Sequence, residues 1–290
     1  MSLRMKFNLA MCLILLIGIS LAGVVIRDRL QAEARRNTAQ TANLLMAAAE
    51  GIRSYTVAYI KPELDQRLAV EFLPQTVPAF AATEAIIALR KQFPEYSYKE
   101  ATLNPTNPRD RTTDWEADIV NGFRADAGLK EISGERTQGP IQALYIAKPI
   151  KVGKDSCLSC HSTPSAAPPS MIRLYGEANG FGWKLNETVG AQVVSVPMSV
   201  PLENAAQAFR TFMTSLAAVF AAVFVVLNLM LSWLIIRPVS QMSDAADKIS
   251  TGDFDQPEFP EQGTDEVAVL ASSFNRMRRS LEKAMQMIDG

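Results

Sequence analysis

Five consecutive residues near the middle of the chain carry its most specific chemistry. They are Cys157, Leu158, Ser159, Cys160 and His161, in the C-x-x-C-H order of covalent haem attachment. This spacing lets two thiols add to the two vinyl groups of one haem, while the imidazole that follows reaches the iron beneath the ring. The motif therefore predicts one haem c, held by thioether links to Cys157 and Cys160, with His161 as the proximal iron ligand.

Two other chemistries are open to the same residues. A zinc site needs four ligands, and this chain offers three within five residues, with no second cluster of cysteine or histidine. Two cysteines in an oxidising compartment can also form a disulfide, which would make the protein a periplasmic dithiol oxidoreductase. That alternative gives no role to the adjacent histidine, so we favour haem.

The residue on the far side of the iron is less constrained. His161 is the only histidine, so a second imidazole from the same chain is excluded, and Cys12 lies in an apolar run where a small apolar role is expected. Met46, Met171 and Met198 are the methionine candidates; Met46 is favoured because three alanines follow it and leave a small-residue face for a haem plane. A weak ligand, water or an open position are the alternatives. Methionine would raise the reduction potential, whereas an open position would admit a small gas.

Two uncharged apolar runs frame this region. Residues 9–26 form a run of 18 and residues 212–236 a run of 25, each long enough to cross a hydrocarbon core of about 30 Å as a helix. We predict transmembrane helices there, after an N-terminal segment at 1–8. The first run could instead be a cleaved signal peptide, since Ser20 and Ala22 are small residues near its end. An uncleaved anchor is favoured because the helical pattern continues directly beyond it.

The charge of the chain excludes some classes of protein and leaves its orientation open. A formal net charge of -1 does not suit a nucleic-acid binder or an acidic disordered tail. Basic residues flank both ends of the first run, so the positive-inside rule does not decide. Haem attachment takes place outside the cytoplasm, and this places residues 27–211 in the periplasm. The prediction is a two-pass inner-membrane protein with a cytoplasmic C-terminal part.

The region between the runs predicts an α+β domain with an antiparallel sheet. The expected elements are a helix at 28–59 that ends before Pro62, a helix at 81–92, a strand at 95–103, a helix at 114–123, a β-rich stretch at 141–152, and a hairpin or two paired strands at 183–200. Asp114 is the candidate cap of its helix, and Asp114, Glu116 and Asp118 are expected on a solvated face. Gly176, Gly180 and Gly182 indicate a turn, because no strand-turn-helix frame for phosphate surrounds them.

The C-terminal part has a different pattern. Apolar residues after Pro238 recur at helical spacing until Gly252, and a second helix is expected after Asp265-Glu266. Its apolar positions step by three and four residues, as in a heptad seam: Val267, Leu270, Phe274, Met277, Leu281, Ala284 and Ile288. Two short helices with such seams cannot bury both alone, so a homodimer is expected.

Residues 237–289 resemble a HAMP domain, the parallel four-helix linker of bacterial membrane receptors. The resemblance rests on Pro238, Gly252-Asp253-Phe254, Asp265-Glu266 and Phe274-Asn275-Arg276-Met277. Upstream, the haem motif, Ile52-Arg53-Ser54-Tyr55-Thr56 with Pro62, Gly180-Phe181-Gly182-Trp183-Lys184, Gly190-Ala191 and Val196-Pro197-Met198 resemble c-haem-binding, PAS-like sensor domains found ahead of HAMP domains in bacteria, cyanobacteria among them. This resemblance implies an antiparallel sheet flanked by helices. In some relatives a cysteine is the distal ligand, and the region between the membrane runs offers no cysteine for that role.

These features together predict a membrane-anchored haem sensor without enzymatic activity. A redox change, or binding of O2, NO or CO, would alter the distal ligand and shift the helix at 28–59, and the HAMP dimer would pass the change on. Because the sequence ends at Gly290 without a kinase, cyclase or methyl-accepting segment, the output would belong to a separate protein such as a histidine kinase, unless the sequence is a fragment. The alternative function is an anchored electron-transfer cytochrome, which would not need a HAMP seam.

Overall fold

The computed structural model describes residues 2–67, 70–138, 141–260 and 263–288. Met1 and Asp289, at the outer ends of the predicted N-terminal segment and HAMP domain, lie outside the described residues. The chain divides into two compact units, one made of Met1–Ile26 with Phe209–Gly290 and the other of Arg27–Ala208. Each unit is described by itself.

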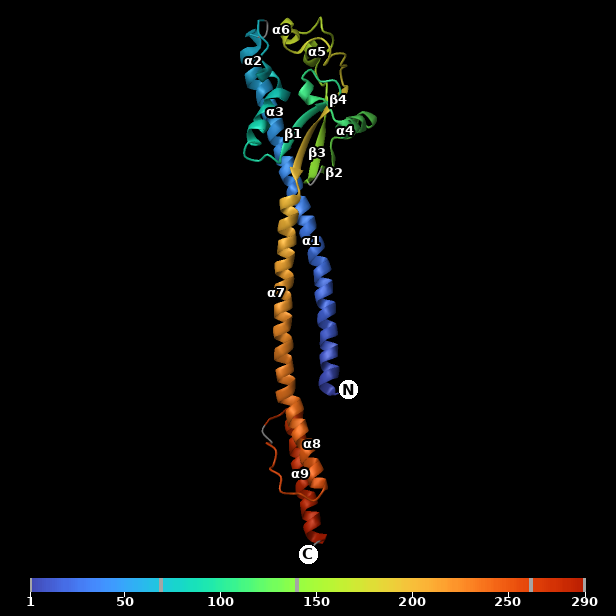
Figure 1. Ribbon diagram of the computed structural model, residues 1–290, viewed down its shortest axis with the longest axis vertical. Helices are drawn as coiled ribbons and strands as arrows, with labels where there is room; N and C mark the ends of the chain where they lie inside the picture. The colour runs from blue at the N-terminus through green and yellow to red at the C-terminus, as the bar shows by residue number, and fades with distance from the viewer. Residues whose placement is uncertain (1, 68–69, 139–140, 261–262, 289–290) are drawn as a thin grey trace. The chain divides into compact units, whose positions relative to one another are not determined.

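A four-stranded antiparallel sheet organises the unit Arg27–Ala208. The strands are β1 (Ser97–Thr102), β2 (Ile132–Gln138), β3 (Ile141–Lys151) and β4 (Thr188–Pro197), in the order β1-β4-β3-β2 (Figure 1). Its helices are the end of α1 (Leu3–Tyr55), then α2 (Lys61–Leu64), α3 (Pro78–Leu89), α4 (Asp114–Ala125), α5 (Asp155–His161), α6 (Pro169–Tyr175) and the start of α7 (Ser199–Leu231). The predicted α+β class with an antiparallel sheet is confirmed.

The expectation of two paired strands at 183–200 is wrong. β4 is one strand, and the residues before Thr188 form the loop that follows the glycine-rich turn. β4 lies between β1 and β3, and all its side chains but that of Ser195 are buried. A strand covered on both faces shows a continuous apolar run rather than alternation, and such a run has no internal signal for its length.

One face of the sheet packs against α1. Met46 and Ala49 of α1 are fully buried in a cluster with Tyr98 of β1 and Val194 of β4, and α3 adds to the same cluster. α1 does not end before Pro62, as predicted, because a π-helical turn (Thr56–Ile60) continues it into α2. Pro62 lies in the first turn of α2, directly after the π-helical turn, and the helix accommodates it there instead of ending before it.

The other face of the sheet packs against α4. Val120 and Phe123 of α4 are buried against Ala147 of β3 and Val193 of β4. The helix is capped by Thr113 rather than Asp114, and the Thr113 amide donates to Glu116 Oε2 at 2.7 Å. The prediction of a solvated Glu116 is also wrong. Its side chain is buried and paired with Lys99 of β1, 2.7 Å between Nζ and Oε2, since the carboxylate faces the sheet edge.

The other unit contains apolar helices and a helical pair. Two helices of the chain, beginning with α1 and with α7, are long and apolar enough to cross a membrane by length and composition. A Cβ added at Gly23 would lie 3.4 Å from Met213 Cε, so within this unit the two apolar segments approach each other closely. α7 continues through a π-helical turn (Ser232–Ile236) into α8 (Arg237–Ser250), and α9 (Glu266–Ile288) follows an extended connector.

The helical pair α8 and α9 buries only part of its apolar surface within one chain. Ala245 and Ile249 of α8 and Ala271 of α9 are buried, whereas Leu270 and Leu281 of the predicted heptad seam are 47% and 44% exposed. The connector is held by Asn275, a buried residue whose amide accepts from Phe259 N at 3.1 Å and donates to Phe259 O at 2.9 Å. The seam of α9 therefore remains open for another helix.

Candidate haem site

The two cysteines and the histidine of the motif lie on a short helix, α5. Cys157, Cys160 and His161 occupy positions i, i+3 and i+4, which point to the same side of a helix. Both thiols are free and half-buried. Within the described part of the chain, no group of three or more His, Cys, Asp or Glu residues is placed to hold one metal ion, as a tetrahedral zinc site would need. The spacing on α5 puts the two thiols and the imidazole on one side of the helix, which is what covalent attachment of a haem would need.

The protonation state of His161 is set by a backbone carbonyl. His161 Nδ1 lies 2.8 Å from Gly180 O, and because a carbonyl oxygen can only accept, Nδ1 carries the proton and donates. The other ring nitrogen, Nε2, then keeps its lone pair for a metal. Burial lowers the pKa of His161, and the hydrogen bond to Gly180 opposes part of that effect. The neutral imidazole that results is the form that binds iron.

The plane of the imidazole is fixed as well. The ring of His161 stacks on the ring of Trp183, with centroids 3.9 Å apart and an angle of 14° between planes. The Trp183 amide donates to His161 O at 3.2 Å, and the Gly182 amide donates to Ser162 O at 2.9 Å. These contacts fasten the end of α5 to the loop before β4, so that the imidazole has one direction in which to present Nε2.

Gly180 occupies a position that a side chain would disrupt. Its φ is +86°, in the left-handed region that favours glycine, and a Cβ there would collide with Thr106. Asn104 holds this loop, since its Oδ1 accepts from Gly180 N at 3.2 Å and its Nδ2 donates to Phe181 O at 3.3 Å. The predicted turn is confirmed, with positive φ at Gly176, Gly180 and Gly182. Sequence reasoning missed that the Gly180 carbonyl orients His161; the cluster of glycines beside a tryptophan was the available signal.

The three methionine candidates lie in different parts of the domain. Met46 lies on α1 and is buried in the core, Met171 is buried on α6, and Met198 is buried just after β4. Met46 packs beside Tyr98, near the start of β1, whereas Thr106, which lies 3.4 Å from His161 Nδ1, follows the end of that strand. The hydrogen-bonding and stacking partners of the His161 ring are Thr106, Gly180 and Trp183. The distal role of a methionine stays a prediction.

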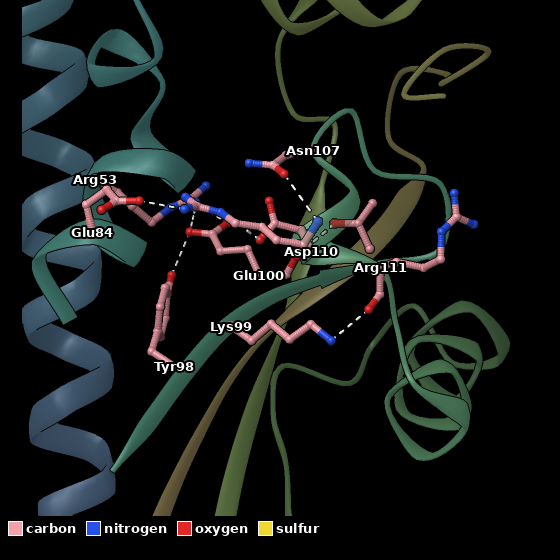
Figure 2. A network of polar contacts seen from close by, with 10 residues as sticks. Arg53, Glu84, Tyr98, Lys99, Glu100, Asn107, Asp110 and Arg111 are labelled. Carbon is pink, nitrogen blue, oxygen red and sulfur yellow. Dashed lines mark hydrogen bonds and ion pairs between the residues drawn. The ribbon is translucent and has the colours of Figure 1, made fainter. Parts of the chain in front are cut away.

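A buried polar network that was not predicted from the sequence joins α1 to the sheet. Figure 2 shows Arg53 of α1 reaching toward Glu100 of β1, with Tyr98 on the same side and Lys99 extending toward Arg111. Arg53 Nη1 pairs with Glu100, and the Tyr98 hydroxyl donates to Glu100 Oε1 at 2.6 Å. Burial and the Glu100 carboxylate raise the pKa of Tyr98, so its hydroxyl remains a donor.

The charge of Arg53 follows from the same network. Burial acts to lower the pKa of Arg53, but the Glu100 carboxylate and the Tyr98 hydroxyl outweigh it and hold that pKa above its ordinary value. The side chain of Glu100 is 4% exposed and that of Arg53 is 25% exposed. Such a pair is costly to break from one side, because the partner is left as a buried charge.

Comparison with known families separates the chain into two matched segments. Residues 31–197 match the Tll0287-like family, and residues 230–283 match the HAMP domain. The crystal structure of the cyanobacterial heme-protein Tll0287 superposes with a TM-score of 0.41 and 15% sequence identity, over 55% of this chain and 93% of that chain.

Two curated relatives have longer chains. Sensor histidine kinase WalK of Bacillus subtilis (strain 168) is 27% identical over 187 residues, which are 59% of this chain and 30% of WalK. Heme sensor protein HssS of Staphylococcus aureus (strain JH9) is 34% identical over 79 residues, which are 27% of this chain and 17% of HssS. The chain thus spans less than a third of the length of these relatives.

Proposed function

The chain belongs to the Tll0287-like family and continues into a HAMP domain, and from this premise we propose that it is a membrane-anchored sensor carrying one haem c. Cys157 and Cys160 form the thioether links, and His161 is the proximal ligand. The sensor domain lies in the periplasm and the HAMP domain in the cytoplasm of a two-pass inner-membrane protein. A homodimer passes the signal to a separate output protein such as a histidine kinase.

The observation that carries this proposal is the geometry of His161. A histidine that donates from Nδ1 to a backbone carbonyl has its other nitrogen free for a metal, and this is how metal-binding histidines are usually oriented. The two thiols on the same side of α5 supply the covalent attachment. A histidine with a purely structural role would not need a free Nε2. A disulfide would not need two free thiols.

The chain's own residues position the group and hold the helix that responds. A bound haem supplies an iron whose oxidation state, or whose sixth ligand, can change. Trp183 and Gly180 keep the imidazole fixed on the proximal side, while Met46, Met171 or Met198, or an exchangeable O2, NO or CO, completes the distal side. Met46 and Arg53 hold α1 on the sheet. We propose that a shift of these contacts moves the helix from one packed arrangement to a second one.

The relatives support signalling as the purpose of this arrangement. WalK is named a sensor histidine kinase and HssS a heme sensor protein, and both share sequence with this chain. An electron-transfer cytochrome would need an anchor but no HAMP domain. We therefore propose the sensor function ahead of electron transfer, and both ahead of a dithiol oxidoreductase.

Visible spectroscopy and mass spectrometry of the purified full chain test the haem. We expect a Soret band, and a protein mass increased by one haem that survives denaturation. Cys157→Ser with Cys160→Ser should abolish the covalent link, while Ser159→Ala, on the same helix, should retain it. A protein expressed with a haem-attachment system that shows no Soret absorption would overturn the proposal in favour of a dithiol protein.

Cross-linking in membranes separates sensing from electron transfer. In a Cys12→Ala background, Leu281→Cys places a thiol on the exposed seam of α9, and Lys283→Cys places one off the seam. A sensor should show faster disulfide formation between copies at position 281 than at 283, with a rate that changes between oxidised and reduced haem, or on addition of CO or NO. Rates at 281 that are the same in every haem state would favour electron transfer.

A further inference from the structure

A cleft lies at the β1 edge of the sheet, between the α4 face and Thr83 and Ile87 of α3, with Arg90 just after that helix. It has a volume of about 760 Å³, within the range of small-molecule sites. Strand register places Ser97 of β1, Ser195 of β4 and Tyr145 of β3 in one row across its floor. Ala143 and Val193 complete the floor with small apolar side chains. The floor therefore combines hydroxyl groups with apolar surface.

An aromatic wall bounds this cleft. The rings of Trp115 of α4 and Tyr145 of β3 meet edge to face, with centroids 5.3 Å apart. Gly134 of β2 is the register partner of Tyr145, and a Cβ there would lie 2.8 Å from the Tyr145 hydroxyl oxygen. The glycine thus lets the tyrosine ring lie close over β2. The two rings stand at 65° to each other and form an angled apolar wall, against which an aromatic ring can pack.

The described charged residues that line the cleft are Arg90, Lys99, Arg109, Arg136, Glu95, Asp110 and Glu116, an excess of one positive charge. Lys99 and Arg109 have carboxylate partners, since Lys99 Nζ lies 2.7 Å from Glu116 and Arg109 Nε lies 3.7 Å from Asp110. Arg136 has no carboxylate within 4.0 Å in the described part of the chain, and its guanidinium lies 4.3 Å from the centre of the Trp115 ring. A guanidinium fixed by stacking, with its N–H groups unpaired, is suited to bind a carboxylate.

We propose that this cleft binds a small monocarboxylate with a planar apolar body. The carboxylate pairs with Arg136, and the planar body packs on Trp115 and Tyr145 over the floor. The partners of His161, which are Thr106, Gly180 and Trp183, do not line the cleft. The sensor domain would accordingly have a second input, chemically unlike the one at the iron.

Isothermal titration of the full-length protein in detergent micelles tests the proposal, with benzoate as the probe. Benzamide has the same ring without the charge, and benzylamine reverses the charge. We expect benzoate to bind with a Kd of about 1 mM or below, and benzamide at least about 10-fold more weakly, the factor that corresponds to one charge-assisted hydrogen bond. Benzylamine should not bind, because it would face Arg136.

Variants test whether Arg136 supplies the positive charge that binds the carboxylate of benzoate. Arg136→Gln should weaken benzoate binding about 10-fold and leave benzamide unchanged, whereas Arg136→Lys should retain a preference for benzoate. Trp115→Leu should weaken both ligands. Lys130→Gln is the matched control, because it removes an exposed charge outside the cleft and should leave benzoate binding unaltered. Thermal unfolding of each variant establishes that it is folded.

Three results would overturn the proposal. The first is equal binding of benzoate and benzamide, and the second is the absence of benzoate binding at about 10 mM. The third is a folded Arg136→Gln protein with unaltered affinity for benzoate. Haem absorption gives an independent readout: benzoate bound at the iron would shift the Soret band, whereas benzoate in the cleft would act equally on a protein without haem.

Discussion

The two faces of the sheet differ in how they are covered. On the α1 face, Met46 and Val194 are fully buried, and the ion pair of Arg53 with Glu100 is enclosed between helix and strand. On the α4 face, only the half near Phe123 is packed, and the half near Trp115 remains an open cleft. One face is suited to hold a helix in a defined position, and the other to admit a ligand.

Within one small domain, the α1 face is thus suited to fix the position of a helix and the α4 face to recognise a ligand. β1 contributes to both, because Tyr98 and Glu100 face α1 while Lys99 faces the cleft side and Glu116. Successive side chains of a strand point to opposite faces, so neighbouring residues can serve different tasks. β3 and β4 also contribute to both faces, with Ile146 and Val194 on the α1 face and Ala147 and Val193 on the α4 face.

Truncation of the α1 face should have the largest effect. Met46→Ala should lower the free energy of unfolding by about 3 kcal/mol, because it removes a fully buried side chain from a close-packed cluster. Met46→Leu keeps the volume and should cost less than about 1.5 kcal/mol. Denaturant unfolding followed by circular dichroism measures both.

The same pair of variants tests the distal ligand. A ligand role predicts that both Met46→Ala and Met46→Leu shift the Soret band and the reduction potential, because leucine cannot bind iron. A purely structural role predicts an unchanged spectrum in the leucine variant. That second result would leave Met171, Met198 or an exchangeable ligand for the distal position.

The ion pairs should rank next, in the order of their burial. Glu100→Gln leaves Arg53 without its partner in a mostly buried position, and should cost about 2 kcal/mol. Glu116→Gln should cost about 1 kcal/mol, since Lys99 is 27% exposed and can still donate to Arg111 O. Lys148→Gln, which breaks a surface pair with Glu50, should cost about 0.5 kcal/mol or less. An equal loss in all three would contradict this dependence on burial.

A pH-dependent effect on stability is expected at the rim of the cleft. Burial raises the pKa of Asp110 to about 6, against the opposing influence of Arg109. The unfolded chain has an ordinary pKa of about 3.9 at this residue, so between these values the folded state binds more protons and stability falls as pH rises. Asp110→Asn should therefore be more stable than the parent by about 1 kcal/mol at pH 7.5 and nearly equal to it at pH 4. A difference between the two proteins that is the same at both pH values would rule this out.

Local patterns predicted the motif and most elements. The spacing of Cys157, Cys160 and His161 identified the candidate site, and the helices at α4, α8 and α9 followed from apolar periodicity and turn residues. Matches to the Tll0287-like family and to the HAMP domain confirmed the resemblance. The errors also have local causes: Thr113 and Asp114 are both good caps, and only the fold decides between them.

Long-range partners could not be predicted. Arg53 and Glu100 are 47 residues apart, and Asn104 and Gly180 are 76 apart. The sequence that flanks each residue does not predict its partner, because such pairs are determined by strand order and helix packing. The cleft is hidden for the same reason, since Ser97, Tyr145 and Ser195 become neighbours only through the register of β1, β4 and β3.

The hydrogen bond from His161 to Gly180 has a consequence for biogenesis. The five residues of the motif are contiguous and are available as soon as they are exported, but the carbonyl that directs the imidazole lies 19 residues later in the chain. Its support from Asn104 requires the end of β1 to have met the loop before β4. If the domain carries the proposed haem c, attachment to the cysteines would precede tertiary structure, whereas the final orientation of the His161 ring would wait for it. Maturation would then have two separable stages, one covalent and one conformational.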